Sequence, residues 1–145
     1  MSVEKAFEFV DTNILVYAHD PSALEKGRVA QELIRRLWDE GSGCLSVQIL
    51  QEFFVAVTRK AAGRMSLDEA EAIVRNLSFW KVQTPSAKDV LGAIEVQRQY
   101  QISFWDAMVV QSAAQSACPI LWSEDLNPGQ VYNGVLVKNP FLAPD

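Results

Sequence analysis

The chain has little of what a zinc site or a nucleophilic triad requires. Its 145 residues include a single histidine, His19, and two cysteines, Cys44 and Cys118. Zinc sites use several closely spaced cysteines and histidines, and Ser-His-Asp or Cys-His mechanisms need a histidine beside the nucleophile. Both cysteines lie in apolar, strand-like segments, so we expect buried, reduced thiols. We interpret His19 as a loop residue.

Positive charge and long apolar runs are also scarce. Thirteen basic residues against eighteen acidic ones give a net charge of −5 at pH 7. This balance argues against a broad basic surface for nucleic acid, but not against an enzyme whose bound metal ions supply local positive charge. No apolar run approaches the ~20 residues of a membrane span, and residues 1–5 do not resemble the start of a signal peptide. We therefore expect one cytoplasmic domain, residues 1–145, with no membrane contact.

What the sequence does contain is a regular alternation of short apolar segments with amphipathic ones. Apolar runs predict strands at residues 7–10, 44–47, 80–83 and 120–122, with a last strand or hairpin within 131–137. Apolar residues at helical spacing predict helices at 14–18, from Pro21 to the glycines at 41 and 43, and at 49–60, 67–77, 87–100 and 104–117. This alternation predicts a three-layer α/β/α fold with a parallel sheet covered on both faces.

Four acidic residues fall where predicted strands end or predicted helices begin: Asp11, Glu52, Asp106 and Asp125. In an open α/β sheet, the carboxyl ends of strands and the amino ends of helices meet along one edge, where ligands bind. Carboxylates gathered there repel one another and need a compensating positive charge. Ligands that are all oxygen atoms suit Mg²⁺ or Mn²⁺ better than Zn²⁺. The sequence therefore predicts a divalent-cation site formed by these acids.

Each acid also has a simpler structural interpretation. Asp11 and Asp125 could close turns or cap short helices, and Glu52 could be a solvated residue on a helix face. Asp106 could complete a capping box with Ser103 at the start of its helix. Taken singly, each acid is weak evidence for a site, and only their joint placement at one edge favours it.

The choice between Glu124 and Asp125 stays open from the residues alone. Both follow the apolar segment 120–122 and either could supply the fourth carboxylate. If the strand continued beyond Trp122, alternation would place Ser123 and Asp125 on one side and Glu124 on the other. That pattern favours Asp125.

At this point four segments resemble the motifs of PIN-domain nucleases. They are VDTNIL at 10–15, SVQILQEFF at 46–54, FWDA at 104–107 and LWSEDL at 121–126. Their order and spacing match over nearly the whole chain, and the resemblance aligns Asp125 with the fourth acid and Ser123 with a frequent hydroxyl. The size is similar to that of VapC-type toxins from type II toxin–antitoxin systems.

The resemblance implies a Rossmann-like parallel sheet of about five strands and a Mg²⁺- or Mn²⁺-dependent endoribonuclease. Its metal-binding and catalytic residues would be the four acids: Asp11, Glu52, Asp106 and Asp125. It also implies RNA as substrate, a homodimer, and inhibition by a VapB-like antitoxin that inserts a segment near the acids. We expect Asn13 and Ser123 to orient carboxylates or water beside the metal, although turn and cap roles would also account for them.

Substrate binding needs positive charge near the acids. Arg59, Lys60 and Arg64 lie close together at the end of the helix that carries Glu52 and are candidates for RNA contact, or else they form a solvated helix end. Two other functions compete. A metal-dependent phosphatase is disfavoured because residue 13 is asparagine, which breaks the Asp-x-Asp pattern of the haloacid dehalogenase group. A non-catalytic RNA- or protein-binding module is disfavoured by the complete set of acids.

Overall fold

The computed structural model describes residues 5–59 and 65–142. In this part of the chain, six strands form one sheet in the order β3-β2-β1-β4-β6-β5. The strands are β1 (Glu8–Val10), β2 (Gly43–Ser46), β3 (Lys81–Gln83), β4 (Ile120–Trp122), β5 (Val131–Tyr132) and β6 (Val135–Lys138). All neighbouring strands are parallel except the hairpin of β5 and β6. The predicted parallel sheet is thus confirmed.

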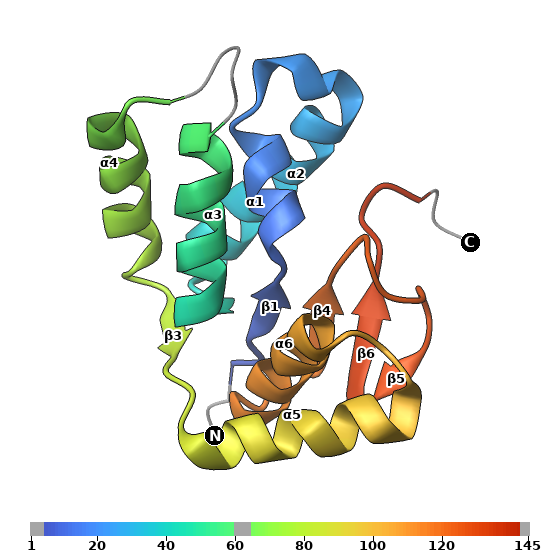
Figure 1. Ribbon diagram of the computed structural model, residues 1–145. Coiled ribbons are helices and arrows are strands. Elements are labelled where there is room, and N and C mark those ends of the chain that lie inside the picture. Colours follow the sequence, from blue (N-terminus) through green and yellow to red (C-terminus); the bar gives the residue numbers. More distant parts are fainter. Residues whose placement is uncertain (1–4, 60–64, 143–145) are drawn as a thin grey trace.

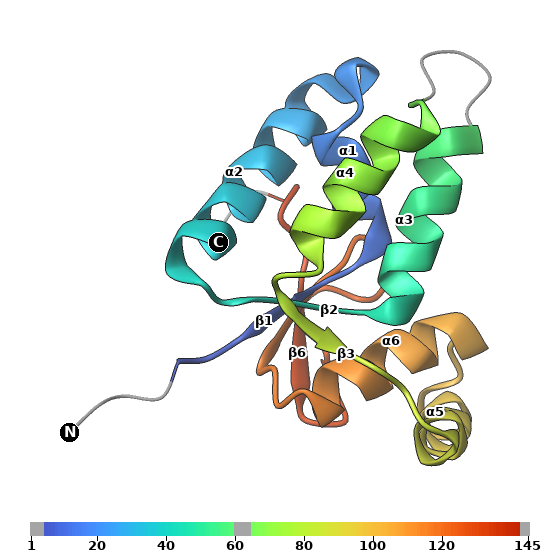
Figure 2. The ribbon, with the colours of Figure 1, turned by 90° about the vertical axis from the view of Figure 1, so that its left-hand side faces the viewer.

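Helices cover both faces of this sheet, which confirms the predicted three layers. They are α1 (Thr12–Ala18), α2 (Leu24–Glu40), α3 (Val47–Arg59), α4 (Leu67–Leu77), α5 (Ala87–Tyr100) and α6 (Phe104–Gln115), with a 3-10 turn, η1 (Pro21–Ala23), before α2. The pair α5 and α6 lies on one side of the sheet, and α2 lies on the other (Figure 2). The helix expected from Pro21 begins at Leu24 instead, because the positive φ of Leu24, 51°, separates η1 from α2.

Serine residues cap the amino ends of three helices, as the sequence predicted. The hydroxyl oxygens of Ser66 and Ser103 each accept a backbone N–H from the third residue of their helices, at 3.1 Å. Ser86 and Asp89 form a complete capping box, in which the Asp89 carboxylate accepts the Ser86 N–H at 2.8 Å. Each cap satisfies an N–H that the helix itself leaves without a partner.

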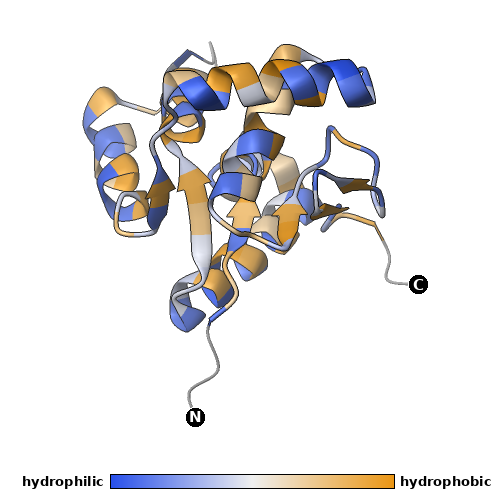
Figure 3. Cartoon of the chain, turned by 90° about the horizontal axis from the view of Figure 1, so that it is seen from below, coloured by the Kyte–Doolittle hydropathy of each residue, from blue (hydrophilic) through white to orange (hydrophobic). Residues whose placement is uncertain are grey.

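The core lies between the strands and the inner faces of the helices. Figure 3 shows the central strands mostly in the hydrophobic colour, whereas the helices alternate between the two colours along their length. Phe9, Leu45 and Leu121, one from each of the three central strands, are fully buried, and each such side chain contributes roughly 1.5–3 kcal/mol relative to an exposed one. Cys44 and Cys118 are buried free thiols, as expected. No helix in the described residues is both long and apolar enough to span a bilayer.

The register of β1 and β4 positions the edge at which the acids gather. Val10 pairs with Trp122, and the Asp11 N–H donates to the Trp122 carbonyl at 3.0 Å. The arrowheads of β1, β4 and β6 point the same way, and α1 rises from the tip of β1 (Figure 1). The strand does not continue beyond Trp122, since the chain bends over residues 124–126. The alternation used to choose between Glu124 and Asp125 therefore does not apply.

Candidate active site

The four predicted acids line one pocket of about 240 Å³ at this edge of the sheet. Asp11 follows β1, Glu52 lies in α3, Asp106 lies in the first turn of α6, and Asp125 follows β4. The pocket is completed by Thr12, Asn13, Gln48, Ala56, Trp105 and Val109. Among the described residues that line it, none is lysine, arginine or histidine. Residues up to 114 positions apart in the chain thus meet around one space, and the described residues that line it bring no positive charge to it.

Asp11 is the buried member of the group, with 5% of its surface exposed. One carboxylate oxygen accepts the Thr12 N–H at 2.7 Å and so caps α1. The other oxygen accepts the Ser123 hydroxyl at 2.8 Å. The capping role and a place in the pocket are compatible, because each carboxylate oxygen accepts one of these bonds and has a second lone pair.

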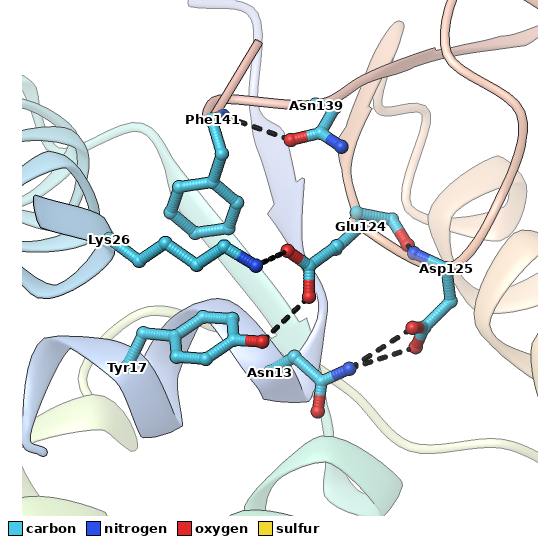
Figure 4. Close-up of polar contacts among 8 residues, drawn as sticks. Asn13, Tyr17, Lys26, Glu124, Asp125, Asn139 and Phe141 are labelled. Carbon is cyan, nitrogen blue, oxygen red and sulfur yellow. Dashed lines mark hydrogen bonds and ion pairs between the residues drawn. The ribbon is translucent and has the colours of Figure 1, made fainter. Parts of the chain in front are cut away.

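Asp125 is held from both sides. The Asn13 amide donates to its two carboxylate oxygens at 3.0 and 3.2 Å, and the Asp125 N–H donates to Ser123 Oγ at 3.1 Å. Glu124 points elsewhere, toward Tyr17 (Figure 4). Asp125 rather than Glu124 thus lines the pocket, and the cause is the bend after β4 together with these hydrogen bonds. Asn13 and Ser123 contact the carboxylates that we expected them to orient.

Glu52 is oriented by two residues that the sequence analysis missed. The Thr12 hydroxyl donates to Glu52 Oε1 at 2.8 Å, and Gln48 Nε2 lies 3.5 Å from Glu52 Oε2. The signal for Gln48 was its position one turn before Glu52 on α3, which places both on one helix face. The signal for Thr12 was weaker, because only the folded structure brings a hydroxyl after β1 against a helix 40 residues later.

Asp106 combines a local and a long-range role. Its backbone N–H donates to the Ser103 cap, and its carboxylate lines the pocket at the amino end of α6. The partial positive charge of a helix amino terminus stabilises a carboxylate in this position. Only the Ser103 half of the predicted capping box is therefore seen, and the Asp106 side chain lines the pocket.

Burial and mutual repulsion raise the pKa values of two carboxyl groups in the pocket. The pKa of Asp11 is raised from its ordinary 3.8 to about 7, because burial and, less strongly, the negative charges of Asp125 and Asp106 outweigh the lowering effect of the Ser123 and Thr12 hydrogen bonds. Partial burial and the charge of Asp106 likewise raise the pKa of Asp125. A cation in the pocket would reverse these shifts, since it favours the charged form of each carboxylate.

The residues present fit a hydrated hard cation. In the described part of the chain, no three acidic, histidine or cysteine side chains already converge closely enough to hold a metal ion. Mg²⁺ keeps several of its waters and is usually held by one or two carboxylates, so a pocket of about 240 Å³ with separated carboxylates suits it. The donors are oxygen atoms throughout, which favours Mg²⁺ or Mn²⁺ over Zn²⁺.

Of the basic residues predicted to contact RNA, Arg59 can be placed. It is exposed at the end of α3, seven residues after Glu52, with the pocket residue Ala56 between them on the same helix face. Lys60 and Arg64 lie outside the described residues. His19 ends α1, with its Nδ1 2.9 Å from the Leu15 carbonyl, and it does not line the pocket of the acids.

The sequence profile of the PIN domain family matches residues 9–133. Several solved structures share the fold. Mycobacterium tuberculosis VapC20, described as a sarcin-ricin loop cleaving toxin, is 20% identical with a TM-score of 0.63, over 81% of this chain and 89% of that one. A toxin–antitoxin complex from Klebsiella pneumoniae is 16% identical with a TM-score of 0.68, over 92% and 98%. DNA-bound VapBC from Salmonella typhimurium is 13% identical with a TM-score of 0.66, over 93% and 98%. Comparison with curated proteins gave no match.

Proposed function

The chain belongs to the PIN domain family, and from this premise we propose that it is a Mg²⁺- or Mn²⁺-dependent endoribonuclease, the toxin of a type II toxin–antitoxin pair. The observation that carries the proposal is the pocket lined by four carboxylates and, within the described residues, by no basic side chain. Such a pocket repels an RNA phosphate unless a cation lies between them. The acids assigned to this cation and to catalysis are Asp11, Glu52, Asp106 and Asp125.

When bound, the cation would polarise the scissile phosphate and make a water molecule more acidic. The residues of the chain supply orientation. Ser123 and the Thr12 N–H fix the two oxygens of Asp11, Asn13 fixes Asp125, and the Thr12 hydroxyl fixes Glu52. Groups that orient metal ligands in this way commonly change metal affinity or activity by about 10- to 100-fold when they are removed.

The same proposal covers partners and location. The structural relatives include toxin–antitoxin complexes, which supports a VapB-like antitoxin for this chain. A homodimer as its own assembly belongs to the same proposal and rests on the family resemblance alone. Two buried free thiols in the described residues support a cytoplasmic location, where cysteines stay reduced.

The direct test is cleavage of structured RNA at increasing Mg²⁺ concentration. We expect endonucleolytic fragments that appear with Mg²⁺ or Mn²⁺ and disappear when EDTA is added, and no release of phosphate from p-nitrophenyl phosphate. Phosphate release without RNA fragments would assign the pocket to a phosphatase. Metal binding with neither reaction would favour a non-catalytic RNA- or protein-binding module.

Arg59 provides a prediction about substrate binding. Because Arg59 extends the pocket face of α3 into solvent, its removal should weaken RNA binding and reduce the salt dependence of the affinity by about one unit of logarithmic slope. The measurement is fluorescence anisotropy of a labelled RNA with Mg²⁺ present, read before cleavage proceeds, for Arg59→Ala at several salt concentrations. The matched control is Arg98→Ala on α5, an exposed arginine that pairs with Glu95. Equal slopes for Arg59→Ala and the unsubstituted protein would remove Arg59 from the RNA-binding surface.

A further inference from the structure

Glu124, the acid that does not line the pocket, is itself held by several groups. The Tyr17 hydroxyl donates to its Oε1 at 2.7 Å, and the Lys26 ammonium forms an ion pair with its Oε2. Figure 4 shows both side chains reaching the Glu124 carboxylate from one side, while the Asp125 carboxylate meets the Asn13 amide. We call Tyr17, Lys26 and Phe141 the Glu124 clamp.

Phe141 joins this clamp through a turn near the end of the chain. After β6, the Asn139 side chain accepts the Phe141 N–H at 2.9 Å and turns the backbone (Figure 4). The Phe141 ring then packs edge-on against Tyr17, at 5.3 Å between ring centres. Lys26 Nζ lies 5.0 Å from the centre of the Tyr17 ring and 5.3 Å from that of Phe141, within cation–π range. The segment after β6 therefore packs against the two residues, from α1 and α2, that hold the Glu124 carboxylate.

The clamp and the pocket are linked through α1. Asn13 and Tyr17 lie one turn apart on this helix, and they bind Asp125 and Glu124, which are consecutive residues. The segment that carries both acids has left the sheet, because β4 ends at Trp122 and the chain bends at 124–126. The Ser123 N–H still donates to the Lys138 carbonyl at 3.0 Å, and beyond Ser123 side-chain contacts position Asp125.

We propose that Glu124 is a positioning residue, and that the clamp fixes it so that Asp125 meets Asn13 and faces the metal pocket. The catalytic consequence of this inference rests on the proposed nuclease function, whereas the effect on the position of Asp125 does not. The ion pair is partly exposed, with 46% of the Lys26 side chain and 23% of the Glu124 side chain accessible. Such pairs add little to stability, so the main contribution of the clamp is orientation.

A purely electrostatic role for these residues makes a different prediction. Removing the positive charge of Lys26 near a cation site would tighten cation binding, and removing the negative charge of Glu124 would weaken it. A positioning role predicts that both changes weaken binding, because each releases the segment that carries Asp125. The sign of the Lys26 effect therefore separates the two explanations.

The experiment compares Lys26→Met and Glu124→Gln with Arg28→Met as the matched control. Arg28 lies on the same helix, carries the same charge and pairs with Glu25 and Glu32 on the surface. Binding of Mn²⁺ is measured from the electron paramagnetic resonance signal of free Mn²⁺. We expect about tenfold weaker binding in Lys26→Met and Glu124→Gln, unchanged binding in Arg28→Met, and melting temperatures in EDTA close to that of the unsubstituted protein.

A second measurement needs neither metal nor activity. The side-chain amide signals of Asn13 in the metal-free protein report its hydrogen bond to Asp125, and we expect them to shift in Lys26→Met and to stay in place in Arg28→Met. If the unsubstituted protein cleaves RNA, Lys26→Met should need about tenfold more Mg²⁺ for half the maximal rate, with the rate at saturating Mg²⁺ changed much less.

Mn²⁺ binding by Lys26→Met as tight as, or tighter than, that of the unsubstituted protein would overturn the positioning role. Unmoved Asn13 amide signals would do the same, even if no Mn²⁺ binds to any form. Failure of the proposed function looks different: the unsubstituted protein would leave RNA intact while the Asn13 signals still respond to the loss of the clamp.

Discussion

Replacing Asp11 or Asp106 with asparagine is expected to abolish Mg²⁺-dependent RNA cleavage while the fold stays intact. Each substitution removes one negative oxygen from a pocket whose function depends on attracting a cation, and it leaves the shape of the side chain almost unchanged. The backbone bond from the Asp106 N–H to Ser103 Oγ does not involve the carboxylate, so the cap of α6 survives. We expect cleavage rates to fall by at least about 100-fold.

A matched control for Asp106→Asn exists at the start of α4. Glu69 occupies the same helix position, with its N–H bonded to Ser66 Oγ at 3.1 Å, but it is exposed and does not line the pocket. Glu69→Gln therefore also removes a negative charge beside a helix amino terminus, but it lies outside the proposed site, so cleavage should be unaffected. Circular dichroism checks that all variants are folded. Full cleavage by both Asp11→Asn and Asp106→Asn would disprove the assignment of the acids.

The strands and most helix limits could be predicted because they depend on short-range patterns. The meeting of the four acids could be predicted because those elements, once placed in a parallel sheet, bring the acids to one edge. Apolar runs specify the buried strands, serine caps specify the starts of α4, α5 and α6, and the parallel topology brings the ends of β1 and β4 to one edge. Asp11 and Asp106 could be recognised in the sequence for the same reason, since each lies next to a predicted strand end or helix cap.

The contacts that orient the acids could not be predicted in this way. Glu124 meets Tyr17, which is 107 positions earlier in the chain, and Ser123 meets Asp11 across 112 positions. No local pattern records these pairings, because they depend on how the bend after β4 packs against α1. The alternation argument, which held only if the strand continued beyond Trp122, does not apply for the same reason, although it favoured the acid that does line the pocket.

The thermal stability of the metal-free protein provides the second large expected effect. Above pH 7, Asp11→Asn should be more stable than the unsubstituted protein, because it removes a buried negative charge that Asp125 and Asp106 repel. Burial raises the pKa of Asp11 from 3.8 to about 7 in the folded state. At about 1.4 kcal/mol per pKa unit, the charged form destabilises the fold by on the order of 4 kcal/mol. Rearranged hydrogen bonds with Ser123 and Thr12 reduce this gain, so we expect about 2 kcal/mol or more.

The pH dependence of this gain has a definite sign. A carboxyl group with a raised pKa in the folded state binds its proton more tightly there than in the unfolded chain, so folding is favoured while the group is protonated. The free energy of unfolding of the unsubstituted protein therefore loses this contribution as the pH rises from about 4 to about 7, and Asp11→Asn does not. Chemical denaturation in EDTA at pH 5 and pH 8 should show the difference between the two proteins growing with pH.

At pH 8, Mg²⁺ should make the unsubstituted protein more stable than Asp11→Asn, which reverses the order expected in EDTA. A cation that binds the folded state alone stabilises it in proportion to its affinity and concentration, and in the unsubstituted protein it also neutralises the repulsion that raises the pKa of Asp11. Asp11→Asn has lost both the repulsion and a ligand, so its melting temperature should respond little to Mg²⁺. The control is Asp39→Asn, an exposed acid on α2 away from the pocket, which should behave as the unsubstituted protein in EDTA and in Mg²⁺. If Asp11→Asn were less stable in EDTA at pH 8, the buried carboxylate would be compensated by its hydrogen bonds alone, and the pocket would have no electrostatic need for a metal ion.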